Sequence, residues 1–425
     1  MCISVRDQGK GKSMKETSKL SLILSMSFVV TGNMLGAGIL ALPIKTGLSG
    51  FIPSVLGILL MWALMLSTAM ILAGQKSLTE SKTADLPTFF QKELGTVGKW
   101  ITVVANMIIL YGLLVAYISG TESVVQGLFT KPVSTPLVMI CFFLVATFLT
   151  LFGMKLMRKG NAVIMILMWV TFGTLVFYCA QHVETPRLRF TDWQYLPASL
   201  PVVVTAFHFH NIIPSICRNM DFDQRAIRKA MFLGTFIGLI MNLIWVCVVI
   251  AALPLDGPGT DTVLAAFHGN QPATVPLSHL LESRAFTISA LVFALLAMTA
   301  AYMANGTALT SFIRDLTTTY LHTSSRAVAA AVAFLPPLII SLVYPNVFLD
   351  AIGLVGGVGI DLIFGILPGW LLIKYGRGKV RVLGYVIVAC FSVVLIYELG
   401  QELGLLHIRP HVEYWNVSHK SIVPH

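Results

Sequence analysis

The chain has 425 residues, of which 56% are hydrophobic and only 11% are charged, and its mean hydropathy is +0.82. A soluble domain carries roughly 25% charged residues, so this composition excludes an ordinary soluble protein and predicts an all-α protein that crosses a membrane many times. The net charge of +10 comes from basic residues that lie mostly between apolar segments, so it indicates membrane topology and does not require nucleic-acid binding.

Eleven apolar segments follow one another along the chain, most of them as long as the ~20 residues that a spanning helix needs. They cover residues 20–44, 51–73, 100–121, 132–154, 160–183, 193–217, 230–255, 285–313, 327–349, 351–373 and 382–397. Most Lys and Arg residues fall on the side of the N-terminus, which the positive-inside rule places in the cytoplasm. The sequence therefore predicts eleven transmembrane helices, with a cytoplasmic tail over 1–19, a membrane domain over 20–404 and an external tail over 405–425.

The ends of the chain and its cysteines indicate no further site. The first apolar segment is too long for a cleavable signal peptide, so we expect it to remain as a helix; translation can begin at Met1 or at Met14. The six cysteines are scattered without a CxxC pair. The histidines of the C-terminal tail have no Cys or acidic partner at ligand spacing, so we expect neither a metal nor a cofactor.

The first apolar segment contains the sequence Thr31-Gly-Asn-Met-Leu-Gly-Ala-Gly-Ile-Leu-Ala-Leu-Pro43. Glycine weakens a helix and proline removes a backbone donor, so this composition predicts a spanning helix that is interrupted near its middle. In lipid, the freed backbone groups are tolerated only where protein or a water-filled cavity satisfies them, which favours a ligand-binding point. Close helix packing through Gly32, Gly36 and Gly38 is the alternative interpretation.

The sixth apolar segment contains a second interruption, Ala206-Phe-His-Phe-His-Asn-Ile-Ile-Pro214, with two histidines, an asparagine and a proline at mid-depth. Interrupted helices at corresponding positions of two halves indicate an inverted repeat. Here helices one to five and six to ten would form this 5+5 repeat, with helix eleven appended. The longest external loop, 256–284, is a candidate lid.

Three segments carry a family resemblance: Gly32-Asn-Met-Leu-Gly-Ala-Gly-Ile-Leu-Ala-Leu-Pro43, Phe209-His-Asn-Ile-Ile-Pro-Ser215 and Tyr344-Pro-Asn-Val-Phe-Leu-Asp-Ala-Ile-Gly353. They resemble the signature segments of the bacterial aromatic amino acid permeases, the tyrosine- and tryptophan-specific transporters, and the resemblance covers nearly the whole chain. It implies the leucine-transporter-like fold of the amino acid–polyamine–organocation superfamily, an inner-membrane location and proton-driven uptake of an aromatic amino acid by the domain 20–404. His208 replaces a small residue usual in that family, which leaves the identity of the substrate open.

A zwitterionic amino acid needs donors for its carboxylate and acceptors for its ammonium. Where helix one restarts near Gly36–Gly38, backbone N–H groups and the positive end of the half-helix favour the carboxylate. Carbonyl groups around Phe207–Phe209 and the Asn33 side chain can accept from the ammonium, while Tyr111 and Tyr117 are candidate stacking surfaces or ordinary packing residues. The predicted substrate site comprises Gly32, Asn33, Gly36, Ala37, Gly38, Phe207, Phe209, His210, Tyr111, Tyr117 and Asn305.

Ionisable groups inside spans are costly, so a function is their default interpretation. Asp361, about mid-way along helix ten, is the favoured proton-coupling residue, and His210 in the second break is another candidate. Glu122, near the external end of helix three, is either a coupling residue or a solvated interfacial carboxylate. In helix eight, Ser311 stands where relatives often carry Asp, and the hydroxyls of Thr310 and Ser311 offer a sodium site in the alternative of a sodium-coupled or broader neutral amino acid symporter.

An intramembrane enzyme that uses His208 and His210 as a metal or acid–base pair is the remote alternative. Neither an HExxH nor a GxSxG motif is present, and the two histidines lack a third ligand. The predicted partners are thus an amino acid substrate, a coupling proton or sodium ion and the lipid bilayer, without nucleic acid. The sequence leaves the oligomeric state open.

Overall fold

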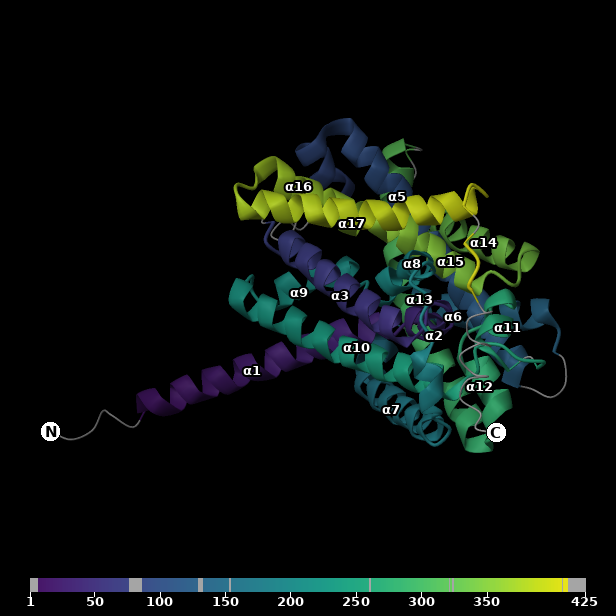
Figure 1. Cartoon of the computed structure of the whole chain (residues 1–425). Coiled ribbons are helices and arrows are strands. Elements are labelled where there is room, and N and C mark those ends of the chain that lie inside the picture. The colour runs from purple at the N-terminus through teal and green to yellow at the C-terminus, as the bar shows by residue number, and fades with distance from the viewer. Residues whose placement is uncertain are drawn as a thin grey trace.

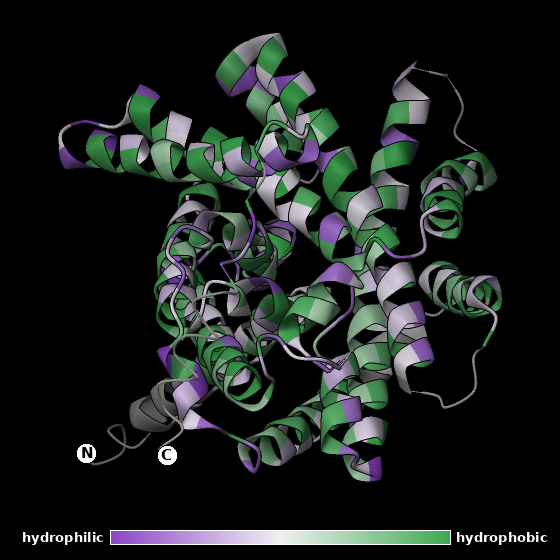
Figure 2. Cartoon of the chain, turned by 45° about the vertical axis from the view of Figure 1, so that its right-hand side comes forward, coloured by the Kyte–Doolittle hydropathy of each residue, from purple (hydrophilic) through white to green (hydrophobic). Residues whose placement is uncertain are grey.

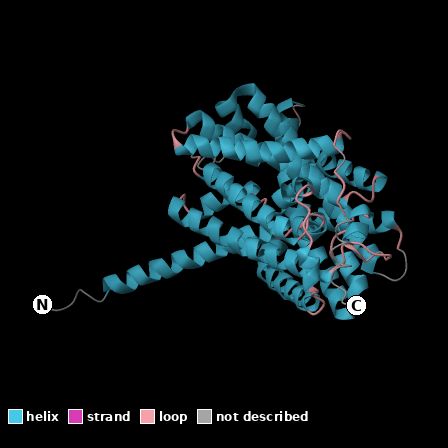
Figure 3. Cartoon of the chain, viewed as in Figure 1, coloured by secondary structure: helices cyan, strands magenta, loops and turns pink. Residues whose placement is uncertain are grey.

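The computed structural model describes residues 7–75, 86–128, 133–152, 154–259, 261–320, 322, 325–406 and 408–411, with the side chains of 7–18 and 154–163 left out. Nearly all of this part of the chain is helical, and its one β feature is a bridge between Gly50 and Thr191 (Figure 3). The predicted all-α architecture is confirmed.

The first half of the chain forms α1 (Asp7–Met34), α2 (Ala37–Gly47), α3 (Phe51–Ala73), α5 (Leu86–Leu128), α6 (Thr135–Phe152), α7 (Met154–Ala180) and the 3-10 turn η1 (Thr185–Arg189). α5 bends at Gly95, whose φ of +74° is a conformation that glycine adopts without strain. A short amphipathic stretch, Leu86 to Leu94, therefore precedes the long apolar part of α5.

The second half forms α8 (Leu196–Ala206), the turn η2 (His210–Ile212), α9 (Ile213–Asn219), α10 (Gln224–Ala252), α11 (Val263–His268), α12 (Thr274–Leu281), α13 (Arg284–Tyr320), α14 (Arg326–Val343), α15 (Phe348–Leu354), the π-helix η3 (Val355–Ile366), α16 (Leu367–Tyr375) and α17 (Lys379–Glu402). Capping side chains set several starts: Asp223 accepts from the Arg225 and Ala226 N–H groups at α10, and Ser325 accepts from the Val328 N–H at α14.

The described residues contain nine helices long and apolar enough to span a bilayer, or ten if the bent pair α1–α2 counts as one span; Ile164–Ala180 is a shorter apolar helix. Hydrophobic residues dominate these helices and hydrophilic ones gather at their ends and in the loops (Figure 2). α6, α14 and α17 expose large apolar side chains such as Phe148, Ile339 and Ile396. This surface suits lipid, whereas the count of eleven spans stays a prediction.

The two interrupted spans lie at the centre of the bundle. Every α2 side chain except that of Lys45 is buried, and α2 packs against α8 and α10 (Figure 1). η3 packs against α5, α8 and α17. Its glycines permit this close approach: a Cβ on Gly356 would overlap the carbonyl oxygen of Pro201 in α8, and one on Gly359 would lie 2.6 Å from Ile109 in α5.

α1 leaves the bundle at its N-terminal end (Figure 1) but packs along α10 nearer its C-terminal end. A Cβ on Gly234 of α10 would lie 2.5 Å from the Ser27 carbonyl oxygen, so the two helices meet at glycine. At the start of α10, the Lys19 ammonium lies 2.5 Å from the Asp223 carboxylate and, by hydrogen bonding to it, lowers the pKa of that carboxyl. α1 and α10 thus form one packed pair.

The predicted external lid, residues 256–284, contains α11 and α12 and lies over α2. The Ala273 N–H donates to the Leu40 carbonyl oxygen at 3.0 Å, and the Lys45 ammonium lies 4.8 Å from the centre of the Phe267 ring. Asn270 accepts from the Leu349 N–H at the start of α15 at 3.0 Å. The α2 side of the bundle is therefore covered by this loop.

Candidate functional site

The first span is interrupted between α1 and α2, whose axes differ by 56°. α1 ends at Met34 and α2 begins at Ala37, with Gly36 as its N-cap at φ −85° and ψ −151°. No side chain caps α2. The N–H groups of its first turn have no acceptor within the helix, so they are directed at the break as potential anion donors.

The sixth predicted span is interrupted as well. α8 ends at Ala206, the chain is irregular from Phe207 to Phe209, and η2 leads into α9. Pro214 lies in the first turn of α9, where its missing N–H removes no helical hydrogen bond. Both interruptions predicted from the glycine and proline pattern are present.

Asn33, near the end of α1, joins the two breaks. Its Nδ2 donates to the carbonyl oxygen of His208 at 3.3 Å and to Oδ1 of Asn211 at 3.2 Å. Two residues earlier, the Thr31 hydroxyl donates to the Gly234 carbonyl oxygen in α10 at 2.8 Å. Both amide hydrogens of Asn33 are thus used within the protein, which leaves its Oδ1 as the atom that can accept from a ligand.

A cavity of about 1140 Å³ opens beside the breaks, with walls from α1, α7 and α13 and single contributions from η2 and α10. Aliphatic, Met and aromatic side chains predominate, and the polar lining residues are Ser25, Asn33 and Asn305. Ligand pockets of ~300–1,000 Å³ hold drug-sized molecules, so an amino acid fits. Among the described residues none from α2 lines the cavity. The cavity therefore opens on the α1 side of the first break.

The three glycines of the first break differ in their surroundings. Gly32 lines the cavity. A Cβ on Gly36 would lie 3.4 Å from the Cβ of Ala301 and 3.8 Å from the Tyr117 hydroxyl, both ordinary contacts, whereas one on Gly38 would lie 2.9 Å from the Cα of Ala206. Gly38 therefore permits the close contact of α2 with α8, a Cβ on Gly32 would lie 3.1 Å from the sulfur of Met165, and Gly36 has room for a Cβ beside the break.

The aromatic residues predicted for the substrate site also differ in their position relative to the cavity. Tyr117 of α5 lies at the site, where its hydroxyl accepts a 3.2 Å hydrogen bond from Nδ2 of Asn305. Tyr111 lies elsewhere, with its hydroxyl donating to a backbone carbonyl of α14 at 2.7 Å. Phe207 and Phe209 are fully buried and do not line the cavity. Of these candidates the structure brings Asn305 to the cavity and places Tyr117 in contact with it, whereas Tyr117, Tyr111, Phe207 and Phe209 do not themselves line the cavity.

The two histidines pack behind the second break rather than in the cavity. The His208 and His210 rings are stacked with centroids 6.0 Å apart, and Phe364 of η3 contacts both at 5.1 and 4.9 Å. Nε2 of His210 lies 3.0 Å from the Thr68 hydroxyl oxygen of α3. Within the described residues, Nε2 of His208 and Nδ1 of His210 have no partner, and no group of three metal-ligating side chains occurs.

Asp361 also lies outside the cavity, fully buried on η3. Neither of its carboxylate oxygens has a hydrogen-bond partner among the described residues. An ionised carboxylate in this setting costs several kcal/mol (~5 or more), so protonation or a bound cation would stabilise the site. Of the predicted coupling residues, Asp361 is the one whose side chain has no hydrogen-bond partner at all among the described residues, whereas His210 lacks a partner only at Nδ1.

Residues 19–403 match the family described as the tryptophan/tyrosine permease family. The chain belongs to this family. It is therefore a multi-pass membrane transporter rather than an enzyme, which sets aside the histidine-based intramembrane enzyme. The resemblance inferred from the three sequence segments is confirmed.

Curated relatives of this permease include two transporters of Haemophilus influenzae. The tyrosine-specific transport system 1 is 26% identical over 340 residues, covering 78% of this chain and 82% of that protein. The tryptophan-specific transport protein is 25% identical over 417 residues, covering 90% of this chain and 96% of that protein.

Two solved transporters share the fold of the permease. A manganese transporter of Eremococcus coleocola, solved with an aromatic bis-isothiourea substituted compound, has a TM-score of 0.60 and 15% identity, covering 98% of this chain and 92% of that one. MhsT, solved with L-phenylalanine, has a TM-score of 0.59 and 16% identity, covering 88% and 98%. These neighbours have the leucine-transporter fold, while the 5+5 repeat of this chain stays a prediction.

Sequence reasoning missed two parts of the permease site. Phe28 of α1 and Trp169 of α7 line the cavity as an edge-to-face pair with ring centroids 6.4 Å apart, yet they lie in uninterrupted apolar segments without a local signal. Glu398 of α17 is only 7% exposed and lies against η3, with its Cβ 2.6 Å from where a Cβ on Gly357 would be. It directly follows the last uncharged segment, a position that could have identified it.

Glu122 is a buried residue on α5 whose carboxylate accepts a 2.7 Å hydrogen bond from the Thr135 hydroxyl near the start of α6. It does not line the cavity. The structure thus gives this carboxylate a donor, in contrast to Asp361.

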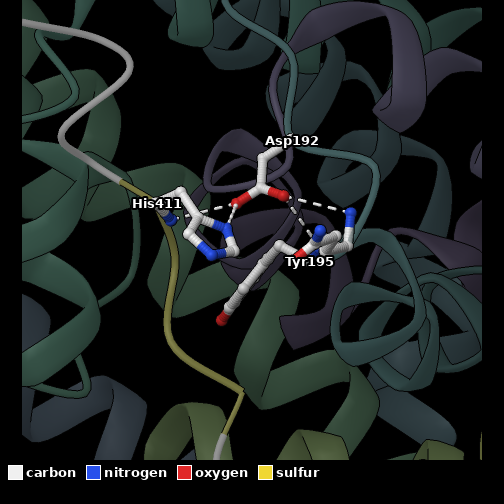
Figure 4. Close-up of polar contacts among 4 residues, drawn as sticks. Asp192, Tyr195 and His411 are labelled. Carbon is white, nitrogen blue, oxygen red and sulfur yellow. Dashed lines mark hydrogen bonds and ion pairs between the residues drawn. The ribbon is translucent and has the colours of Figure 1, made fainter.

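The C-terminal tail of the permease contacts the turn before α8 (Figure 4). Asp192 accepts from the Gln194 and Tyr195 N–H groups through Oδ1, at 3.0 and 3.2 Å, and from the backbone N–H of His411 through Oδ2 at 3.0 Å. Nδ1 of His411 lies 3.0 Å from the same oxygen. One buried carboxylate therefore orders the start of α8 and positions the tail beside it; the other tail histidines lie outside the described residues.

Proposed function

We propose that this permease imports an aromatic amino acid, tyrosine or tryptophan, across the bacterial inner membrane by proton symport. The observation that carries the proposal is the apolar cavity beside two broken helices. Its walls suit a ring, and the break presents both donors and acceptors for a zwitterion. The names of the Haemophilus influenzae relatives support tyrosine or tryptophan as the substrate.

In this proposal the carboxylate binds at the N-terminus of α2. The first-turn N–H groups of Gly36, Ala37 and Gly38 lack acceptors in their own helix, and the helix dipole adds a partial positive charge there. The ammonium binds Oδ1 of Asn33 and carbonyl groups at the end of α1 near Gly32. The side chain then extends into the apolar cavity.

Coupling is assigned to Asp361, with His210 as the second candidate. A proton on Asp361 would offset the cost of burying its two unpartnered oxygens, which no described side chain offsets. Glu122 is less suited because the Thr135 hydroxyl already stabilises its carboxylate. A proton that binds together with substrate and leaves after it would then make uptake depend on the pH gradient.

The distribution of basic residues among the loops supports a cytoplasmic N-terminus. The cavity on the α1 side then faces the cytoplasm, and the loop of α11 and α12 closes the external side. Transport by alternating access requires a second state in which the packed pair α1–α10 moves toward α7 and α13 to close this cavity.

The decisive experiment is uptake by proteoliposomes of labelled tyrosine, tryptophan, phenylalanine and leucine under separately imposed proton and sodium gradients. We expect accumulation of aromatic substrates under a proton gradient. No uptake of any aromatic amino acid would refute the substrate class, and accumulation under a sodium gradient alone would refute proton coupling.

A pair of variants tests the placement of the site. Gly36→Leu adds a side chain beside Tyr117 and the α2 N-terminus, so we expect loss of substrate binding in a protein that still inserts. Gly173→Leu in α7 is the matched control, because no atom lies within 4 Å of a Cβ there. Equal binding by the two variants would place the substrate elsewhere.

A further inference from the structure

Asn305, on the α13 wall of the cavity, forms a polar pair with Tyr117 of α5, which does not itself line the cavity. Nδ2 of Asn305 donates to the Tyr117 hydroxyl at 3.2 Å and to the carbonyl oxygen of Ala301, one turn earlier in α13, at 2.9 Å. An amide nitrogen has two hydrogens, so both are used. Reversing the amide would place Oδ1 against the Ala301 carbonyl oxygen, acceptor against acceptor. The orientation of Asn305 is therefore fixed by its neighbours.

This orientation leaves Oδ1 of Asn305 without a donor. The residue is only 6% exposed, lines the cavity, and Oδ1 has no hydrogen-bond partner among the described residues. A buried acceptor left unpaired costs about 1–3 kcal/mol. The Oδ1 atom is itself buried just beneath the cavity surface, so a ligand donor reaches and satisfies this acceptor when the substrate displaces the side chains around it.

The surroundings of this acceptor suit a flat ring. Ala300, Ala301 and Ala304 give α13 a smooth surface along the cavity, and Asn305 ends this row. Met165 and Trp169 on α7 line the cavity as well. Apolar and aromatic surfaces of this kind favour an aromatic side chain, whereas an ammonium group would lose hydration there without a charged partner.

We propose that Asn305 determines specificity by accepting a hydrogen bond from the ring of the substrate, the indole N–H of tryptophan or the phenol O–H of tyrosine. The inference rests on the proposed transport of aromatic amino acids and deepens it. It predicts that the permease discriminates against phenylalanine, which has no ring donor. A site built around a buried acceptor rejects analogues that leave the acceptor unpaired more strongly than an apolar pocket rejects a small change in size.

The test measures equilibrium binding to the purified full-length permease of four ligands: tryptophan, 1-methyltryptophan, tyrosine and phenylalanine. For the unmodified protein we expect tryptophan to bind at least ~10-fold more tightly than 1-methyltryptophan. We expect tyrosine to bind more tightly than phenylalanine by the same factor. In Asn305→Leu, which removes the acceptor at similar size, we expect both preferences to disappear while phenylalanine affinity changes less than ~3-fold.

Asn242→Leu is the matched control. Asn242 of α10 is buried like Asn305, and its Nδ2 donates to the carbonyl oxygen of Gly238, four residues earlier, at 2.9 Å. Its Oδ1 likewise has no partner among the described residues, but Asn242 does not line the cavity. We expect this variant to retain the ligand preferences of the unmodified protein. Loss of the preferences in Asn242→Leu as well would contradict a direct contact with Asn305.

Equal weakening of all four ligands in Asn305→Leu would overturn the inference, because the residue would then bind the amino acid backbone or hold the wall. If that variant does not fold, equal binding of tryptophan and 1-methyltryptophan by the unmodified protein overturns it. If the permease binds aromatic ligands, phenylalanine included, without preferring those that have a ring donor, only the role of Asn305 is refuted. If it binds no aromatic ligand, the proposed function and this inference are refuted together.

Discussion

Replacing Gly356 with Ala tests the packing that holds the second break in place. A Cβ there would overlap the carbonyl oxygen of Pro201 and lie 2.8 Å from its carbon, well inside the ordinary contact distance of about 3.4 Å or more. α8 and η3 would have to separate by more than ~0.5 Å, which would also strain the 2.9 Å hydrogen bond from the Thr205 hydroxyl to the Ile352 carbonyl oxygen.

Overpacking costs about 1–3 kcal/mol and a lost hydrogen bond about 1 kcal/mol, while alanine in a helix gains up to ~1 kcal/mol over glycine. We therefore expect Gly356→Ala to lower the free energy of unfolding by about 2–3 kcal/mol. Gly173→Ala, with no atom within 4 Å of the new Cβ, should raise it by up to ~1 kcal/mol.

The assay is the apparent melting temperature of both variants in the same detergent, together with tryptophan binding. We expect Gly356→Ala to melt several degrees below Gly173→Ala and to bind substrate weakly, because α8 positions the second break. Equal melting temperatures, or a Gly356→Ala protein with normal binding, would contradict the close contact of η3 with α8.

Three further outcomes are expected. Asp361→Asn should abolish substrate accumulation driven by a pH gradient. It should spare the exchange of internal for external substrate, since exchange does not require the empty permease to return to its outward-facing state. Normal accumulation by this variant would show that another residue couples transport to protons. Two thiol cross-links, each made in a background without native cysteines, test whether α1 and α10 move together. A cross-link of Lys19→Cys to Asp223→Cys joins α1 to α10 and should leave uptake intact, whereas a cross-link of Phe28→Cys to Trp169→Cys joins α1 to α7 and should stop uptake. The opposite pattern would contradict a moving α1–α10 pair. A reporter fused after the C-terminus should be active only outside the cytoplasm, and cytoplasmic activity would refute an odd number of spans.

The interruptions of the two central spans could be predicted from sequence because their causes are local. Glycine and proline act on the backbone of their own segment, so Gly36 and Pro214 indicated breaks without knowledge of any neighbour. The helical class and the membrane location likewise follow from composition. A family resemblance carried by three short segments supplied the rest of the fold.

The directions of the side chains could not be predicted, because they depend on which neighbour each helix face meets. Tyr111 and Tyr117 lie on the same helix and have the same chemistry, yet one contacts a carbonyl of α14 and the other lies beside the break. In the sequence Gly38 is equivalent to Gly36, and only the position of α8 beside Gly38 distinguishes the two. The π-helix around Asp361 also depends on three neighbouring helices and has no signature in the segment itself.

The segment from Phe207 to Asn211 connects the cavity to the buried ionisable groups. On one side, the His208 carbonyl and the Asn211 side chain accept hydrogen bonds from Asn33, which lines the cavity. On the other side, the His208 ring contacts Phe364 on η3, three residues from Asp361. In the proposed mechanism, a change of charge on η3 would shift Phe364 and the histidine rings, and the same irregular backbone would move the acceptors that hold Asn33. A break without its own helical hydrogen bonds can transmit such a shift at low cost, so in this mechanism the second interruption would act in coupling as well as in binding.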